Sequence, residues 1–95
     1  MKHNTTDRAK IVARVQLYVE ERSCHRNLAT RIRWRQVGIW CLYNHYGFYT
    51  PALIGVFGQS RVQVYRDLRA ARFFVNKQPS FKADVEALKQ FVAKG

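Results

Sequence analysis

The chain has 95 residues, 47% of them hydrophobic, so it is long enough for one folded domain with a core, too short for two, and too apolar for a disordered protein. No apolar run approaches the roughly 18 residues of a membrane span, and no secretory signal is visible in the polar start MKHNTTDRAK. Two cysteines are too few for a disulfide framework, so we expect a reducing cytoplasm. Seventeen Lys and Arg against six Asp and Glu give a formal net charge of +11, which indicates a polyanionic partner.

The first predicted helix begins near Asp7 and fades through the polar residues 22–27. Thr6 is expected to cap it, and an acid at Asp7 suits the positive end of the helix dipole. Apolar residues then recur at spacings of three and four, which predicts a stripe that faces the core. The stripe consists of Ile11, Val12, Val15, Tyr18 and Val19, and Arg22 ends it.

The second predicted helix runs from about Ala29 to Tyr46 and changes character halfway. Residues 31–36 are basic, whereas residues 37–46 are apolar on nearly every side. A helix that is apolar all round is buried between other helices. Gly47 is well placed to end this helix, because glycine readily adopts the left-handed conformation found after many helix C-termini.

A short third helix is predicted over Pro51–Phe57. Thr50 offers a capping hydroxyl, and Pro51 suits the first helical position. Gly58 is expected to stop this helix and to form the turn that follows.

Two longer helices complete a predicted all-α fold of five helices, because no segment alternates for long enough to form a strand. The fourth helix begins around Ser60 and is broken at Gln78-Pro79, and Ser80 is expected to cap the fifth. Both carry apolar residues at spacings of four, three and four. These residues are Val64, Leu68, Ala71 and Val75 in the fourth helix, and Phe81, Val85, Leu88 and Val92 in the fifth.

The segment from Thr50 to Leu68 has the pattern of a helix-turn-helix. The inner face of the first helix must be compact and apolar, and Leu53, Ile54 and Phe57 fit that need. Val64 and Leu68 are expected to anchor the second helix to the core. Ser60, Arg61, Gln63 and Arg66 then remain outside, where Arg61 suits a guanine edge, Gln63 an adenine edge and Arg66 a phosphate.

Two stretches resemble the C-terminal DNA-binding domain of the bacterial replication initiator DnaA. Residues 35–42, RQVGIWCL, resemble the R-Q-x-A-M-Y-L-A of that domain, and Pro51, Leu53, Phe57 and Gly58 fall where the family has P-x-I-G-x-x-F-G. The similarity extends over the whole chain and includes the wider group of the Trp repressor. The resemblance implies that the helix-turn-helix enters the major groove. It also implies that Arg31, Arg33 and Arg35 reach phosphates and the minor groove.

The sequence departs from the family at the element that reads the initiator's own site. The R-D-H-T-T-V that follows the glycines in the family is replaced here by residues 60–65, SRVQVY. The same target sequence is therefore not expected. A nucleotide-binding loop of the form G-x-x-x-x-G-K-[ST] is absent as well, so the chain is not a complete initiator.

Three other kinds of site are weaker readings of the sequence. The dense aromatic residues around Trp34 could stack on bases, although helical spacing favours the core for most of them. Cys24, His25, Cys41 and His45 include zinc-ligand types, but the spacing is poor and a buried free thiol is favoured at Cys41. The six acids fall at expected helix caps or exposed turns, so no catalytic group is expected, and no cofactor or metal either. Of Phe73 and Phe74, one is expected in the core and the other on the surface.

The sequence therefore predicts a small, basic module that binds double-stranded DNA. It would act as a transcriptional regulator or a replication accessory protein, of a kind that a phage or another mobile element could encode. The resemblance to the initiator implies that it works in the bacterial cytoplasm or nucleoid, or in the cytoplasm of an infected host. The alternative is an interaction protein that binds a protein partner or structured RNA through the same fold. The oligomeric state stays open. The candidate DNA-binding residues are Arg26, Arg31, Arg33, Arg35, Thr50, Ser60, Arg61, Gln63 and Arg66.

Overall fold

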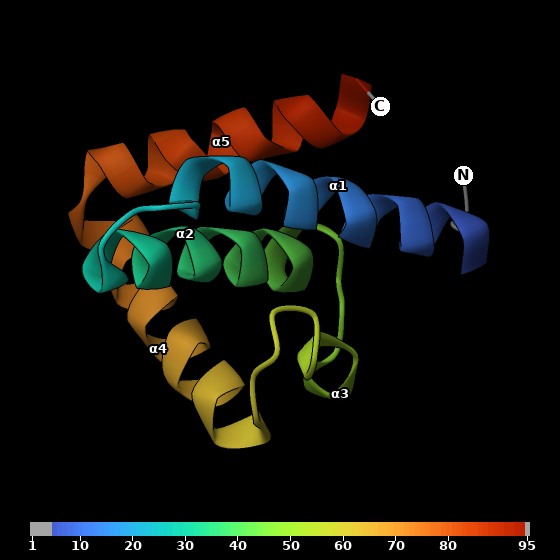
Figure 1. Cartoon of the computed structure of the whole chain (residues 1–95), viewed down its shortest axis with the longest axis horizontal. Coiled ribbons are helices and arrows are strands. Elements are labelled where there is room, and N and C mark those ends of the chain that lie inside the picture. The colour runs from blue at the N-terminus through green and yellow to red at the C-terminus, as the bar shows by residue number, and fades with distance from the viewer. Residues whose placement is uncertain (1–4, 95) are drawn as a thin grey trace.

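The computed structural model describes residues 5–94, and within them the chain forms helices and connections without a strand. The elements are α1 (Thr5–Ser23), α2 (Leu28–Trp40), a π-helical turn η1 (Cys41–His45), α3 (Thr50–Leu53), α4 (Arg61–Lys77) and α5 (Pro79–Lys94). α2 lies at the centre and packs against α1, α4 and α5. α3 and the beginning of α4 lie on the side of the molecule away from α5 (Figure 1). The predicted all-α fold with five α-helices is confirmed.

The first and last helices bury most of the stripes that the sequence indicates, although Val12 of α1 is only partly buried at the edge of the core. Ile11, Val15, Tyr18 and Val19 of α1 are buried. All four apolar residues expected on the inner face of α5 are buried as well. α1 begins at Thr5, two residues before Asp7, so Thr6 lies within the helix, and its predicted capping side chain falls outside the described residues.

α2 and η1 form one continuous helical segment, close to the predicted span. Asn27 caps its start, because the Asn27 carboxamide oxygen accepts from the Thr30 backbone N–H at 2.9 Å. Residues 37–42 are all buried, as the apolar second half predicts, but the burial expected for the rest of that half is wrong, because Asn44 and His45 are exposed. A Cβ on Gly38 would lie only 2.9 Å from a methyl of Val19 and 3.0 Å from the ring of Phe57. The absence of a side chain at Gly38 therefore lets α1 and the turn after α3 approach α2.

The short helix α3 ends earlier than the sequence indicates. It stops at Leu53, because Ile54 is already extended (ψ 124°) and Gly55 adopts a positive φ of 91°. Gly58, with φ 72°, has the predicted turn conformation. At the other end of α3, Tyr49 occupies the capping position, so Thr50 lies inside the first turn and the predicted cap at Thr50 is wrong. Leu53 is buried as expected, but Ile54 is 37% exposed, so its predicted place on the inner face is wrong.

The junctions on either side of α4 differ from each other. Ser60 and Gln63 form a reciprocal capping box at its start, which confirms the predicted cap. At its end, Gln78 alone separates α4 from α5, and Pro79 is the first residue of α5. Ser80 therefore lies in the first turn, and its predicted role as the cap is wrong.

Candidate nucleic-acid interface

The outward face of α4 is a stripe of exposed apolar and basic side chains. Val64, Asp67 and Ala71 form the buried side of this helix. Leu68 and Val75, predicted to lie in the core, are only partly buried and pack at its edge. At about 100° per residue, the positions opposite the buried side are 62, 66, 69 and 73. We define the α4 outer face as seven exposed residues on or beside this side of the helix: Arg61, Val62, Tyr65, Arg66, Arg69, Arg72 and Phe73.

A buried carboxylate fixes α4 to the centre of the molecule. Asp67 is the only acid of α4, and its side chain is 3% exposed, so the expectation that every acid lies in a cap or an exposed turn is wrong here. Arg35 of α2 donates to both carboxylate oxygens, at 2.7 Å from Nε and 3.3 Å from Nη2. Gln36 of α2 and Gln59 of the preceding turn also donate to it. Asp67 therefore joins α2, the turn and α4 at one point.

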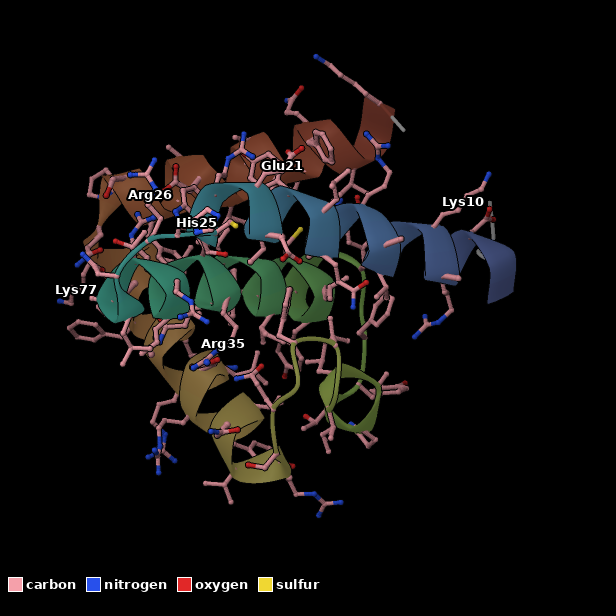
Figure 2. All side chains as sticks on the ribbon, in the orientation of Figure 1. Lys10, Glu21, His25, Arg26, Arg35 and Lys77 are labelled. Carbon is pink, nitrogen blue, oxygen red and sulfur yellow. The ribbon has the colours of Figure 1, made fainter. Side chains whose placement is uncertain are left out.

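The three arginines expected as one basic stretch do not all lie on the same side of α2. Residues two apart on a helix lie about 200° apart, so Arg33 lies opposite Arg31 and Arg35, which line one groove together. Arg33 pairs with Asp84 of α5, whereas Arg35 reaches down to α4 (Figure 2). Arg31 is exposed, and none of the ion pairs found within residues 5–94 includes it. Arg33 and Arg35 would have to leave their ion pairs to bind a phosphate, whereas Arg31 would not.

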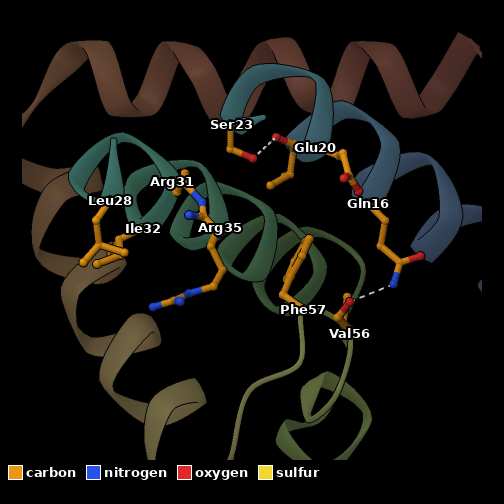
Figure 3. Close-up of a pocket in the computed structure, with 10 residues that line it drawn as sticks. Gln16, Glu20, Ser23, Leu28, Arg31, Ile32, Arg35, Val56 and Phe57 are labelled. Atoms are coloured by element: carbon orange, nitrogen blue, oxygen red, sulfur yellow. Dashed lines mark hydrogen bonds between the residues drawn. The ribbon is translucent and has the colours of Figure 1, made fainter. Parts of the chain in front are cut away.

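A groove of about 520 Å³ lies between the end of α1, the start of α2 and the turn after α3 (Figure 3). Val19, Val56 and Phe57 contribute its apolar lining, and Arg31 and Arg35 line it from α2. Gln16 holds the turn in place, since its carboxamide nitrogen donates to the Val56 carbonyl at 2.7 Å. The groove therefore lies beside this contact between α1 and the turn, and Arg31 and Arg35 line it together.

The residues at the start of α4 do not all remain available for contact with DNA. The Gln63 side-chain oxygen accepts from the Ser60 N–H at 3.0 Å, and the Ser60 hydroxyl accepts from the Gln63 N–H at 3.3 Å. Contact of Gln63 with an adenine edge needs both ends of its amide, and the oxygen is already held by the Ser60 N–H, so the capping box restricts how this side chain can reach a base. Arg61 is exposed beside this box and makes no ion pair within the described chain.

Arg26 lies apart from the other candidates. It belongs to the connection between α1 and α2, at the end of the molecule away from the start of α4 (Figure 2). Arg69 and Arg72 are the basic residues that the sequence analysis missed. The signal that could have found them is their spacing of three and six residues from Arg66, which places all three on the exposed half of one helix.

The residues considered for other kinds of site lie in different surroundings: Cys41 is buried, whereas Cys24, His25 and His45 are exposed. Burial raises the pKa of the Cys41 thiol to about 12, so it stays protonated and unreactive. Within residues 5–94, no three His, Cys, Asp or Glu side chains gather as metal ligands would. Trp34 is partly buried and packs edge-on against Tyr18 with ring centroids 6.1 Å apart. Phe73 is exposed and Phe74 packs on the core, which confirms the predicted division between them.

Among the described helices, none has the length and hydropathy that crossing a bilayer requires. Comparisons of the chain with protein-family models, with curated proteins and with solved structures give no match. The likeness to the initiator domain therefore stays a prediction, and the chemistry of the α4 outer face has to be argued from this molecule alone.

Proposed function

We propose that the chain binds double-stranded DNA, with α3, the turn and α4 acting as a helix-turn-helix. The observation that supports this most directly is the charge of the α4 outer face. Arg61, Arg66, Arg69 and Arg72 are exposed there and take part in none of the ion pairs within residues 5–94. The single acid of the helix is buried on the opposite side. Such a face attracts a polyanion, and each phosphate that it neutralises releases counterions.

The length of α4 suggests that its first turns contact bases and its later turns contact phosphates. Its 17 residues extend about 25 Å, about twice the ~12 Å width of the major groove. The first two turns can therefore enter the groove, with Arg61 placed for a guanine edge. Arg69 and Arg72 lie further along and are placed for the phosphates that border the groove. Arg31, on α2, is the candidate for a phosphate contact outside α4.

The firm attachment of α4 to the rest of the domain suits DNA binding, because contacts with bases depend on a fixed orientation of the helix. The four donated hydrogen bonds at Asp67 hold α4 against α2 and the turn. A chain of this kind would act in the cytoplasm as a transcriptional regulator or as a replication accessory protein.

Binding of random-sequence duplex DNA, followed by fluorescence anisotropy over a range of salt, tests the proposal. The wild type should bind duplex DNA more tightly than structured RNA of equal length. Changing Arg66 and Arg69 together to Ala should weaken binding to every duplex alike. The log–log salt slope should become shallower by about 0.9 for each phosphate that the protein no longer neutralises.

The matched control removes two positive charges elsewhere, at Lys10 of α1 and Lys94 of α5. The first half of α1 and the end of α5 lie far from the start of α4 (Figure 1). This control should keep most of the wild-type slope. Equal losses in both double variants would mean that only net charge matters. A wild type that binds no duplex at moderate salt would contradict the proposal and leave a protein partner or structured RNA as the ligand.

A further inference from the structure

Val62 holds the most outward position at the start of α4. It is the second residue of the helix and is 63% exposed. It lies about 160° around the helix axis from the fully buried Val64. A β-branched residue gains little in a solvent-exposed helical position, because its χ1 freedom is lost there without any burial in return. The fold therefore gives no reason for a valine at this position.

The polar neighbours of Val62 leave it as the central group of the first two turns. Ser60 and Gln63 are bonded to each other in the capping box. Arg61 and Arg66 flank the valine, and Tyr65, one turn further along, is also exposed. The first two turns of α4 thus expose Val62 and Tyr65 among arginines, with Arg61 directly before the valine and Arg66 one turn after it.

The ligand that fits this surface is a DNA duplex with a thymine at the base pair that faces Val62 in the major groove. The flanking arginines favour the phosphates and the guanine edges of DNA. The C5-methyl group of thymine is the apolar group that a base pair presents in the major groove. A valine offers two methyl groups and no hydrogen-bonding atom, so it packs favourably against a thymine methyl and gains nothing from the polar edges of the other bases.

We propose that Val62 is a specificity-determining residue that recognises thymine by contact with its C5-methyl group. This inference rests on the proposed binding of duplex DNA. It differs from the contact expected of Arg61, because it concerns an apolar contact that salt should leave largely unchanged.

The test begins with a duplex selected from a random pool for binding to the wild type. Each thymine of that duplex is then replaced, one at a time, by deoxyuridine, which pairs identically and lacks only the methyl group. At one thymine the wild type should lose about four-fold in affinity, the value of one buried methyl-sized group. At the other thymines that α4 does not touch, the exchange should have no effect.

The Val62→Ala variant links the effect to this residue. It should bind the thymine duplex about as weakly as the wild type binds the uracil duplex, and it should lose little more when thymine is exchanged for uracil. Leu17→Ala, which shortens an exposed apolar side chain of α1, should keep the full response to uracil. Because Val62 is exposed, its change to Ala should leave the melting temperature close to that of the wild type.

The outcomes separate the inference from the function on which it rests. Tight duplex binding with no response to uracil at any position would overturn the role of Val62 and leave DNA binding intact. A response to uracil that Val62→Ala retains in full would assign the contact to another residue and also overturn it. Failure of the wild type to bind any duplex would overturn the proposed function itself.

Discussion

Two ion pairs join arginines of α2 to acids elsewhere in the chain, and they differ in burial. The carboxylate of Asp67 is 3% exposed and that of Asp84 is 32% exposed. The Arg33–Asp84 pair is partly buried, but both side chains still reach water, so the pair adds little to the free energy of unfolding. The Arg35–Asp67 pair behaves differently, because removing the buried carboxylate leaves Arg35, which is only 28% exposed, without an opposite charge, and leaves Gln36 and Gln59 without their acceptor.

Changing Asp67 to Asn should therefore lower the free energy of unfolding by about 3–5 kcal/mol. The matched change of Asp84 to Asn should cost about 0–1 kcal/mol. Urea denaturation followed by circular dichroism measures both. Equal costs for the two variants would mean that Asp67 is solvated and does not hold α4 in place.

The position of Asp67 could not be predicted from the sequence for a physical reason. An acid on an amphipathic helix is ordinarily exposed, and nothing local distinguishes Asp67 from such a residue. Its burial depends on donors from Arg35, Gln36 and Gln59, which come from two other parts of the chain. Arg35 was identified as a functional residue, but its partner lies 32 residues away, beyond the reach of a local pattern.

At the scale of the elements, the long helices could be predicted and the short one could not. The stripes of α1 and α5 repeat over several turns, so each residue supports the same helical phase. α3 has a single turn, and its end depends on whether Ile54 or a later residue leaves the helix. The sequence is compatible with an end before Gly55 and with an end before Gly58, because either glycine can terminate a helix. In the structure the helix ends before Gly55, and the Ile54 side chain is consequently exposed.

Neighbouring alanine substitutions test this end of α3. Leu53→Ala should lower the free energy of unfolding by about 2–5 kcal/mol, because Leu53 is fully buried. Ile54→Ala should cost much less, since its side chain is more than one third exposed. Thermal melting of the two variants side by side measures the difference. A larger loss for Ile54 would mean that the helix continues past Leu53 and that the predicted inner face was right.

At the scale of the whole molecule, the positive charges are close enough to repel one another when the salt concentration is low. The radius of gyration is 12.5 Å, whereas the Debye length is about 30 Å at 0.01 M salt and about 3 Å at 1 M. At low salt the net charge of +11 therefore repels itself across the entire molecule. Part of the small acidic complement is used for ion pairs within the chain, as Asp67, Asp84 and Glu86 show.

The melting temperature of the free protein should consequently rise as sodium chloride is increased from low to moderate concentration. With duplex DNA bound, the melting temperature should instead fall as salt is added. The DNA neutralises the positive charges at low salt, and added salt releases it from the protein. Differential scanning fluorimetry with and without a duplex measures both trends. A free protein that loses stability with added salt would show that its ion pairs outweigh the repulsion.

The close approach at Gly38 has a consequence for which sequences can encode this fold. A library that replaces each glycine in turn should reject nearly every residue at Gly38, since even a methyl group would meet Val19 and Phe57. At Gly58 the constraint is torsional, because φ is positive while nothing within 4 Å would meet a Cβ. Asparagine, which tolerates that conformation, should survive at Gly58 and fail at Gly38. Two glycines of one chain would thus be distinguished by their permitted replacements, one by volume and the other by backbone torsion.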